Sequence, residues 1–370
     1  MAVSVRLLTK QHHPFGTNYS DYQLITPPGL GGFIKGDSVM KVLFIFSKLK
    51  VFCASAIMLV SMLVVSSSAF ADANFPTRPI TMTVGFSAGG PTDNAARVVA
   101  EELSKELGQP VVVSNKPGAG GVIAARDLLN SSPDGYTIML VSNGPMTVVP
   151  ARYASLDFDP LTDFVPIGMV AGYPHILVVG PESDISSFQD FIEKAKASPG
   201  TLNVAQVGSV NELATEWIKA LADIEVTQVP YKGAAAVVSD LSTGRIDLAM
   251  IAPNVAYPLI EGNKARAIAA TSSTEITKAR NIPSIAQSGI PDIDFYIWNG
   301  LVAPKGTDPA VVKKMSDALA KVQQNPALKE KLAVTYLDIV PGGPDRMMET
   351  VKKEGENWKR IATDANLPPL

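Results

Sequence analysis

The chain has 370 residues, of which 18% are charged and 46% hydrophobic, with a formal net charge of −3 at pH 7. This length is enough for two domains of ordinary size. The slight excess of acidic residues excludes the basic face that nucleic-acid binding needs, so we expect no nucleic-acid partner.

The first 71 residues look like segments outside the mature fold. Residues 1–39 are polar and glycine-rich without a helical or strand period, so we interpret them as a non-native or disordered extension, with the true start at Met40. Residues 40–71 combine lysines, an apolar run over 51–65 and an A-x-A-like site, which is typical of a secretory signal peptide. A membrane anchor is the alternative, but the run is short for a bilayer span. We therefore expect cleavage after Ala71.

The residues behind that site restrict the chemistry. Residues 72–370 carry 26 Lys and Arg against 33 Asp and Glu once the first 71 are set aside, a net charge of about −7. They contain no cysteine and one histidine, His175. This excludes a cysteine nucleophile, a disulfide and a His- or Cys-rich metal cluster, so we expect no cofactor and no metal. His175 lies in an apolar run, where a satisfied structural histidine is favoured over a catalytic base.

Strand and helix signals alternate in the first part of the mature chain. Ala96, Val99 and Leu103 repeat at helical spacing, and Gly108 ends that helix. The expected elements are strands over 80–86, 111–114 and 136–142, with helices over 92–107 and about 121–130.

The same alternation resumes after residue 174. The expected strands cover 175–180, 202–208, 226–231, 246–252 and 265–272, and the helices cover 187–197, 209–222, 234–242 and a short segment before Gly262. Short continuous apolar runs are typical of parallel strands covered on both faces. We therefore predict an α/β fold with mostly parallel sheets.

The C-terminal part is richer in helix. The expected elements are strands over 295–304 and 336–340, with helices over 308–324, 325–333 and 344–364. This tail is too small for a third domain, so we expect it to pack back on the first one. The predicted division is lobe 1 from 72–172 and 299–370, and lobe 2 from 173–298, with a cleft between them.

Several loops between a strand and a helix consist of small residues. They are Ser87 to Gly90, Gly208-Ser209 and Tyr231 to Gly233, and Asn143-Gly144 follows another strand. Ligands of open α/β sheets lie beyond the carboxyl ends of strands. Free backbone N–H groups at helix starts attract anions, so an acidic protein can bind an acid without a basic patch.

Each of these loops also has a purely structural interpretation. Two glycines before a helix can form a tight turn, Thr92 can be a helix N-cap, and Asp93 suits a first turn. Ser209 and Glu212 fit a capping box that needs no ligand. The glycine patterns lack the spacing of dinucleotide and P-loop motifs.

A series of motifs resembles the tricarboxylate-transporter solute receptors, also called Bug-type periplasmic binding proteins. In chain order they are "AGGPTDNAAR", "QPVVVSNKPGAGG", "SPDGYT", "DFVPIG", "VPYKG", "DLSTGRID", "IPSIAQSGIP" and "WNGLVAPKGT". The resemblance implies a two-lobed clamshell (type II-like periplasmic-binding-protein) fold and a location in the periplasm of a Gram-negative type cell. It also implies a carboxylate or amino-acid ligand that is passed to membrane transporter subunits without chemistry, by a protein that we expect to be a monomer.

The resemblance also implies which loops hold a ligand carboxylate, largely through backbone amides and bridging waters. The positions that match the family pattern are Phe86, Ser87, Ala88, Gly89, Gly90, Thr92, Asp93, Ser142, Asn143, Val207, Gly208 and Ser209.

Two positions depart from the family pattern. Gly85 stands where the family often has proline, and Glu212-Leu213 where it often has His-Leu. A negative charge at Glu212 would weaken binding of a second carboxylate or answer an amino group.

Two other functions stay open from sequence alone. One is a secreted hydrolase with paired carboxylates, such as a glycosidase, although no carboxylate pair flanks a glycine loop. The other is a ligand-sensing partner of a signalling protein.

Overall fold

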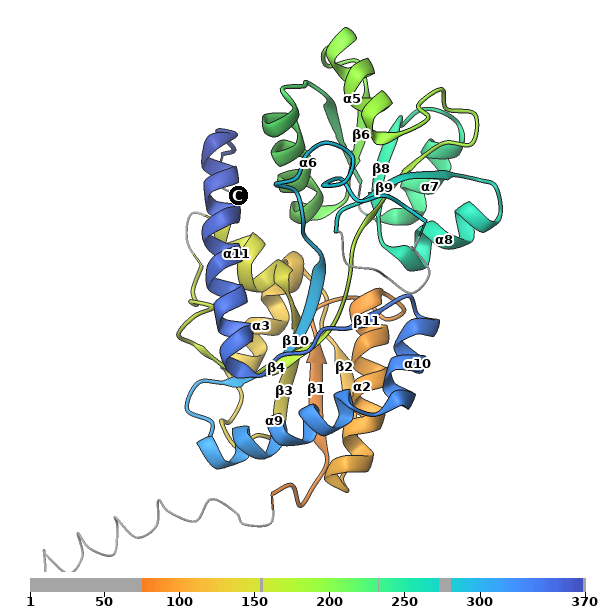
Figure 1. Cartoon of the computed structure of the whole chain (residues 1–370). Helices are drawn as coiled ribbons and strands as arrows, with labels where there is room; N and C mark the ends of the chain where they lie inside the picture. The colour runs from red at the N-terminus through yellow and green to blue at the C-terminus, as the bar shows by residue number, and fades with distance from the viewer. Residues whose placement is uncertain (1–74, 154–155, 232, 273–280, 369–370) are drawn as a thin grey trace, which may run out of the picture. The chain divides into compact units, whose positions relative to one another are not determined.

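A computed structural model describes residues 75–368 apart from 154–155, 232 and 273–280 (Figure 1). The predicted extension and signal peptide therefore lie outside the described residues. The segment from residue 70 onward forms one compact unit.

The first of two sheets has six strands in the order β11-β4-β10-β3-β1-β2. Their bounds are β1 Ile80–Val84, β2 Val111–Asn115, β3 Thr137–Ser142, β4 Phe164–Tyr173, β10 Ile297–Pro304 and β11 Asp338–Ile339.

Helices from both ends of the described chain pack around this sheet. They are α2 Pro91–Leu107, the short turn η2 Ala119–Gly121, α3 Val122–Leu129, η3 Gly144–Val148, α4 Val149–Arg152, α9 Pro309–Gln323, α10 Pro326–Val334 and α11 Pro344–Asp364. In α2, Pro91 occupies the first helical position and Gly108 ends the helix in a left-handed conformation, φ +68°. Its apolar face, with Ala96, Val99 and Leu103, is fully buried against the sheet.

The second sheet has five strands in the order β7-β6-β8-β5-β9. The strands are β5 Ile176–Val179, β6 Asn203–Gln206, β7 Thr227–Pro230, β8 Leu248–Ile251 and β9 Arg266–Ala270, and the helices are α5 Phe188–Ala197, α6 Gly208–Ala222, α7 Ala234–Ser242 and α8 Pro253–Glu261. Their apolar side chains build two separate clusters on the faces of the sheet.

The α/β class is confirmed, but the sheets are mixed rather than mostly parallel. Four of the described strand pairings are parallel and five are antiparallel. The antiparallel pairings involve β4, β5 and β10, which lie on either side of the passages between the two sheets. Where the chain leaves one sheet and later returns to it, the two strands involved run in opposite directions. Local sequence patterns do not reveal this.

Sequence analysis also missed β4. This strand contains Pro166, Gly168 and Gly172, residue types that weaken strands. Its pairing with β10 shifts register between Gly168 and Pro166, so the irregular residues coincide with a bulge.

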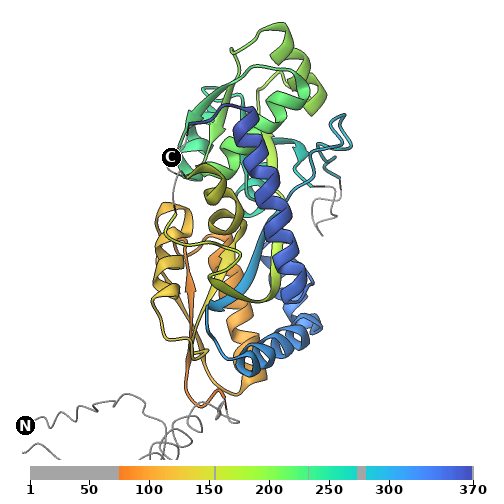
Figure 2. The same cartoon turned by 90° about the vertical axis from the view of Figure 1, so that its left-hand side faces the viewer.

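The last helix, α11, contacts elements that belong to both sheets' parts of the fold. Along its length α11 packs on β4, η3, α4 and α6 (Figure 2). Near its end Trp358 lies edge-on to Trp217 and Phe295, with ring centroids 5.8 and 5.6 Å away. The tail therefore reaches beyond the first sheet, on which sequence analysis expected it to pack.

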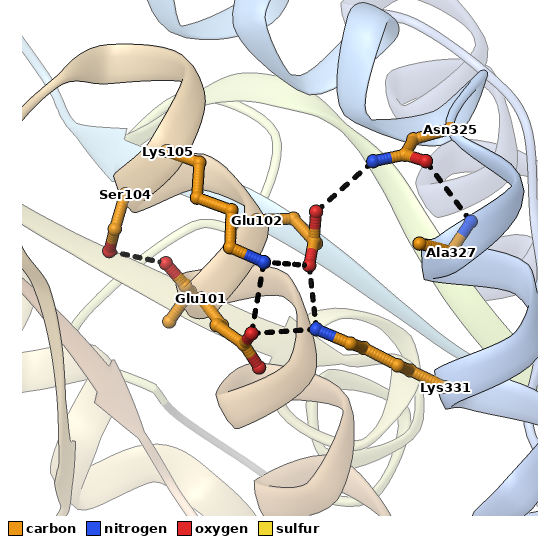
Figure 3. Close-up of polar contacts among 8 residues, drawn as sticks. Glu101, Glu102, Ser104, Lys105, Asn325, Ala327 and Lys331 are labelled. Atoms are coloured by element: carbon orange, nitrogen blue, oxygen red, sulfur yellow. Dashed lines mark hydrogen bonds and ion pairs between the residues drawn. The ribbon is translucent and has the colours of Figure 1, made fainter.

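An ionic cluster docks α10 on α2 (Figure 3). Glu102 is only 4% exposed, and its Oε1 accepts hydrogen bonds from Lys105 Nζ and Lys331 Nζ, each at 2.8 Å. Its Oε2 accepts one from Asn325 Nδ2 at 3.1 Å, and Asn325 also caps the start of α10. Lys105, followed by Lys331, holds the pKa of Glu102 below its ordinary value.

Glu102→Gln should lower the free energy of unfolding at pH 7 by about 1–3 kcal/mol, because charge-assisted bonds to two ammonium groups become neutral ones. The lowered pKa means that the carboxylate stabilises the fold above its unfolded pKa and ceases to as pH falls through the folded value. Urea unfolding at pH 7 and pH 3 should thus show a difference that shrinks in acid.

The matched control is Glu106→Gln on the same helix, which breaks an exposed pair with Lys321. That change should stay within about 0.5 kcal/mol. Equal losses in the two variants would contradict a special role for Glu102.

Candidate functional site

A cavity of about 830 Å³ opens where the loop after β1, the end of β3 and the start of α6 meet. Residues of both sheets line it. Eleven of the twelve predicted ligand residues are among the lining residues: Phe86, Ser87, Ala88, Gly89, Gly90, Thr92, Ser142, Asn143, Val207, Gly208 and Ser209.

The first loop needs glycine at one position and benefits from it at the next. Gly89 has φ +83°, a left-handed conformation that side chains rarely adopt. Gly90 has φ −76° and ψ 167°, which any residue can adopt, and it is the N-cap of α2. What Gly90 contributes is therefore the absence of a side chain at the cavity.

Asp93, the remaining predicted residue, is 1% exposed and acts within the protein. Its carboxylate accepts hydrogen bonds from Gly89 N at 2.8 Å, Arg97 Nε at 2.9 Å and Asn115 Nδ2 at 2.9 Å. Burial by itself raises the pKa of Asp93, but these hydrogen bonds, Arg97 first, outweigh burial and keep the pKa below its ordinary value. Asn115 Nδ2 also bonds Phe86 O, so this pair holds the loop in shape.

The opposite wall begins at the N-terminus of α6. Gly208 has φ +77°, and Val207 is the N-cap, so no side chain caps the first N–H groups. Gly90 likewise leaves the start of α2 without a side-chain cap. Uncapped N–H groups and the positive end of the helix dipole favour an anion. Asn211 Nδ2 fixes α6 against the sheet by donating to Met250 O at 2.7 Å.

The lining residues that the structure describes, which leave out position 232 beside Gly233, carry no Asp, Glu, Lys or Arg. The polar lining residues His175, Asn211, Asn254 and Tyr173 were not predicted from the sequence. His175 was expected to be a satisfied structural histidine, but its ring is on the cavity wall and its buried Nδ1 has no hydrogen-bond partner among the described residues. Burial lowers the pKa of His175 to about 4. The signal for this role in the sequence was the position of His175 close to the predicted crossing between the two lobes.

Two amide side chains at the cavity also have an oxygen atom without a hydrogen-bond partner. The Oδ1 atoms of Asn143 and Asn254 are buried without a partner in the described part of the chain. A buried carbonyl oxygen without a donor is unfavourable, so a ligand hydroxyl that donates to it gains affinity.

Glu212 does not belong to the lining residues. Its Oε1 is 2.9 Å from Nη2 of Arg152, whose side chain is 2% exposed, and Arg152 Nη1 also donates to Pro368 O. The Arg152 guanidinium thus answers the Glu212 charge, and the expectation that Glu212 would act on a ligand is wrong in this geometry.

A carboxyl group lies behind Asn143. Glu354 Oε2 accepts a hydrogen bond from Trp298 Nε1 at 2.9 Å and from Thr147 Oγ1 at 3.4 Å. Thr147 Oγ1 is also 2.9 Å from Asn143 O. Burial raises the pKa of Glu354 to about 7, against the two hydrogen bonds, which lower it.

Two features are absent from the described residues. No cluster of three or more His, Cys, Asp or Glu with metal-binding geometry occurs among them. None of the helices they form is long and apolar enough to cross a membrane.

Comparison with known proteins gives a consistent result. Residues 95–367 match the family described as "Tripartite tricarboxylate transporter family receptor". BugT of Bordetella pertussis is 33% identical over 293 residues, which is 78% of this chain and 90% of BugT.

Solved structures agree. A protein of R. palustris solved with adipate is 31% identical, with a TM-score of 0.72 over 80% of this chain and all of that one. MatC from Rhodopseudomonas palustris with bound malate is 27% identical, with a TM-score of 0.68 over 78% of this chain and 99% of MatC.

Glu354→Gln should stabilise the protein at pH 8 by on the order of 2 kcal/mol. The pKa of this carboxyl is about 7 in the folded state and about 4 in the unfolded chain. Between these pH values only the unfolded chain has released the proton, so the free energy of unfolding falls as pH rises. Glutamine avoids this loss and still accepts the bond from Trp298.

Urea unfolding at pH 4 and pH 8 checks this expectation, with similar stabilities at pH 4. The exposed Glu356 on the same helix is the control, since Glu356→Gln should change neither value. A Glu354→Gln protein that is less stable than wild type at pH 8 would refute the buried-acid interpretation.

Proposed function

The chain belongs to the family of tripartite tricarboxylate transporter receptors, periplasmic solute-binding proteins, and on this premise we propose that it captures a small carboxylate in the cavity between its two sheets. It then hands the ligand to the membrane subunits of such a transporter. One observation carries the proposal: the cavity has uncapped helix starts on both sides and no ionised side chain among its described lining residues.

This arrangement suits an anion that touches both sheets at once. N–H groups at the start of α2 and α6 are fixed by the backbone, so they need no reorganisation when a carboxylate arrives. A ligand bound to both sides favours the closed arrangement of the two lobes by its differential affinity. The lining residues contain no carboxylate pair, so hydrolysis by paired carboxylates gains no support at this cavity.

The ligand class follows from the missing charges. An ammonium group calls for a carboxylate partner when it is buried, and the lining offers none. We therefore favour a carboxylic acid without an amino group over an amino acid. Relatives solved with adipate and malate carry ligands of this kind.

The proposal includes the route and form of the mature protein. Cleavage after Ala71 releases residues 72–370 into the periplasm as a monomer. Lobe 1 then comprises 72–172 and 299–370, and lobe 2 comprises 173–298. The membership of the two sheets supports this division.

A panel of organic acids and amino acids should raise the melting temperature for a few acids only, with malate and adipate as the first to test. At a free concentration of about 100 times Kd, the gain in the free energy of unfolding should be roughly 2.7 kcal/mol. Calorimetry then gives Kd. A flat response to every acid would refute the proposal, and loss of binding on adding a chelator would refute its metal-free part.

Gly90→Val should weaken binding of such an acid at least tenfold, about 1.4 kcal/mol, with little loss of stability. The φ of Gly90 is ordinary, and a Cβ there would meet nothing closer than Ser87 O at 3.4 Å. The valine methyl groups would instead occupy the space that the carboxylate needs. Calorimetry measures affinity, and circular dichroism confirms folding.

The control is Gly118→Val in the neighbouring turn. Gly118 has φ +141°, and a Cβ there would lie 2.3 Å from Ile123 Cδ1. This variant should lose roughly 1–3 kcal/mol of stability, while its folded fraction binds with nearly unchanged affinity. A folded Gly90→Val protein that binds as tightly as wild type would remove the first loop from the site.

A further inference from the structure

His175 lies in the two-residue passage between β4 and β5, and its backbone is held firmly. His175 N donates to Thr271 Oγ1 and Thr271 N donates to His175 O, each at 3.0 Å. Thr271, which is fully buried, also bonds the returning passage: Oγ1 donates to Phe295 O and Phe295 N donates to Thr271 O, each at 2.9 Å. One threonine thus ties both passages together and fixes where the His175 ring can point.

One nitrogen of the His175 ring lacks a partner. The ring lies against Tyr173, with centroids 6.0 Å apart, and His175 is among the residues that line the cavity. Its Nδ1 is buried and has no hydrogen-bond partner in the described segments. A ligand that reaches this nitrogen would satisfy a buried polar atom.

The described neighbours of the His175 ring do not balance a positive charge on it, so the ligand would have to. Tyr173 on β4 is the titratable neighbour, and burial raises its pKa. On the second sheet the adjacent residues Ile176, Ile251 and Ala270 are apolar. Among the described lining residues, which carry no ionised side chain, His175 is the one that can become a cation near neutral pH.

We propose that His175 determines specificity for anionic ligands by binding a ligand carboxylate and taking up one proton from solvent on its imidazole when the ligand binds. The carboxylate stays ionised, so the complex contains a new His⁺–carboxylate pair. The inference rests on the proposed function and deepens it: the two helix starts hold one anionic group, and His175 answers a second.

The pH dependence has a definite sign. In the free protein burial keeps the imidazole neutral, with its pKa lowered to about 4. A carboxylate beside the ring raises that pKa toward the ordinary value of about 6.5. Between these values each lower pH unit tightens binding up to tenfold, so Kd should fall about tenfold from pH 7.5 to pH 5.5.

Calorimetry of malate and adipate at both pH values, in two buffers of different ionisation enthalpy, measures Kd and proton uptake together. Wild type should take up close to one proton at pH 5.5. The matched variant is His175→Asn, whose amide replaces Nδ1 without titrating. It should bind without this uptake, and it corrects for protonation of the ligand and of Glu354.

A direct readout does not depend on affinity. The sequence has three histidines, so the ring signals of His175 are identified in a nuclear magnetic resonance spectrum by their absence from His175→Asn. Their titration midpoint should rise on adding either acid. Binding with equal proton uptake in wild type and variant, or with an unmoved midpoint, would overturn this inference alone. Absence of binding of every acid in the panel at both pH values would overturn the proposed function with it.

Discussion

A buried anion needs partners, and the described lining residues of the cavity include no lysine or arginine. In the proposed function the attraction therefore comes from backbone N–H groups at helix starts, whose positions depend on the loops before them. That constraint explains why the loop after β1 is built from small residues. It also explains why Asp93 and Asn115 are committed to holding the loop in place.

The two segments that connect the sheets impose a second structural constraint. Both pass Thr271, whose hydrogen bonds join the outgoing segment at His175 to the returning one at Phe295. A change in the relation of the two sheets must therefore involve residues in contact with the cavity wall. Through α11 and its aromatic contacts with Trp217, the C-terminal helix adds a second connection between the same regions.

Two half-buried ionisable groups near the cavity respond to pH in opposite directions. The lowered pKa of His175 makes the free protein more stable as pH rises from about 4 toward 6.5, whereas the raised pKa of Glu354 makes it less stable from about 4 to 7. Their effects on folding partly cancel in this range. In the proposed function a ligand anion lies beside His175, so the larger change in protonation on binding is expected there.

The sequence by itself determined the α/β class and nearly all of the helices and strands, because periodicity and glycine or proline stops are local properties. Small residues at the carboxyl ends of strands pointed to the loops at Ser87–Gly90, Asn143-Gly144 and Gly208-Ser209, and the family resemblance implied the full set of eleven predicted residues that line the cavity. Only the tertiary structure decided the direction of β4 and β10, the hydrogen bonding of Asp93 to other residues of the protein, and the pairing of Glu212 with Arg152. It alone placed His175 at the cavity, because a side chain's partners come from segments distant in sequence, such as Thr271.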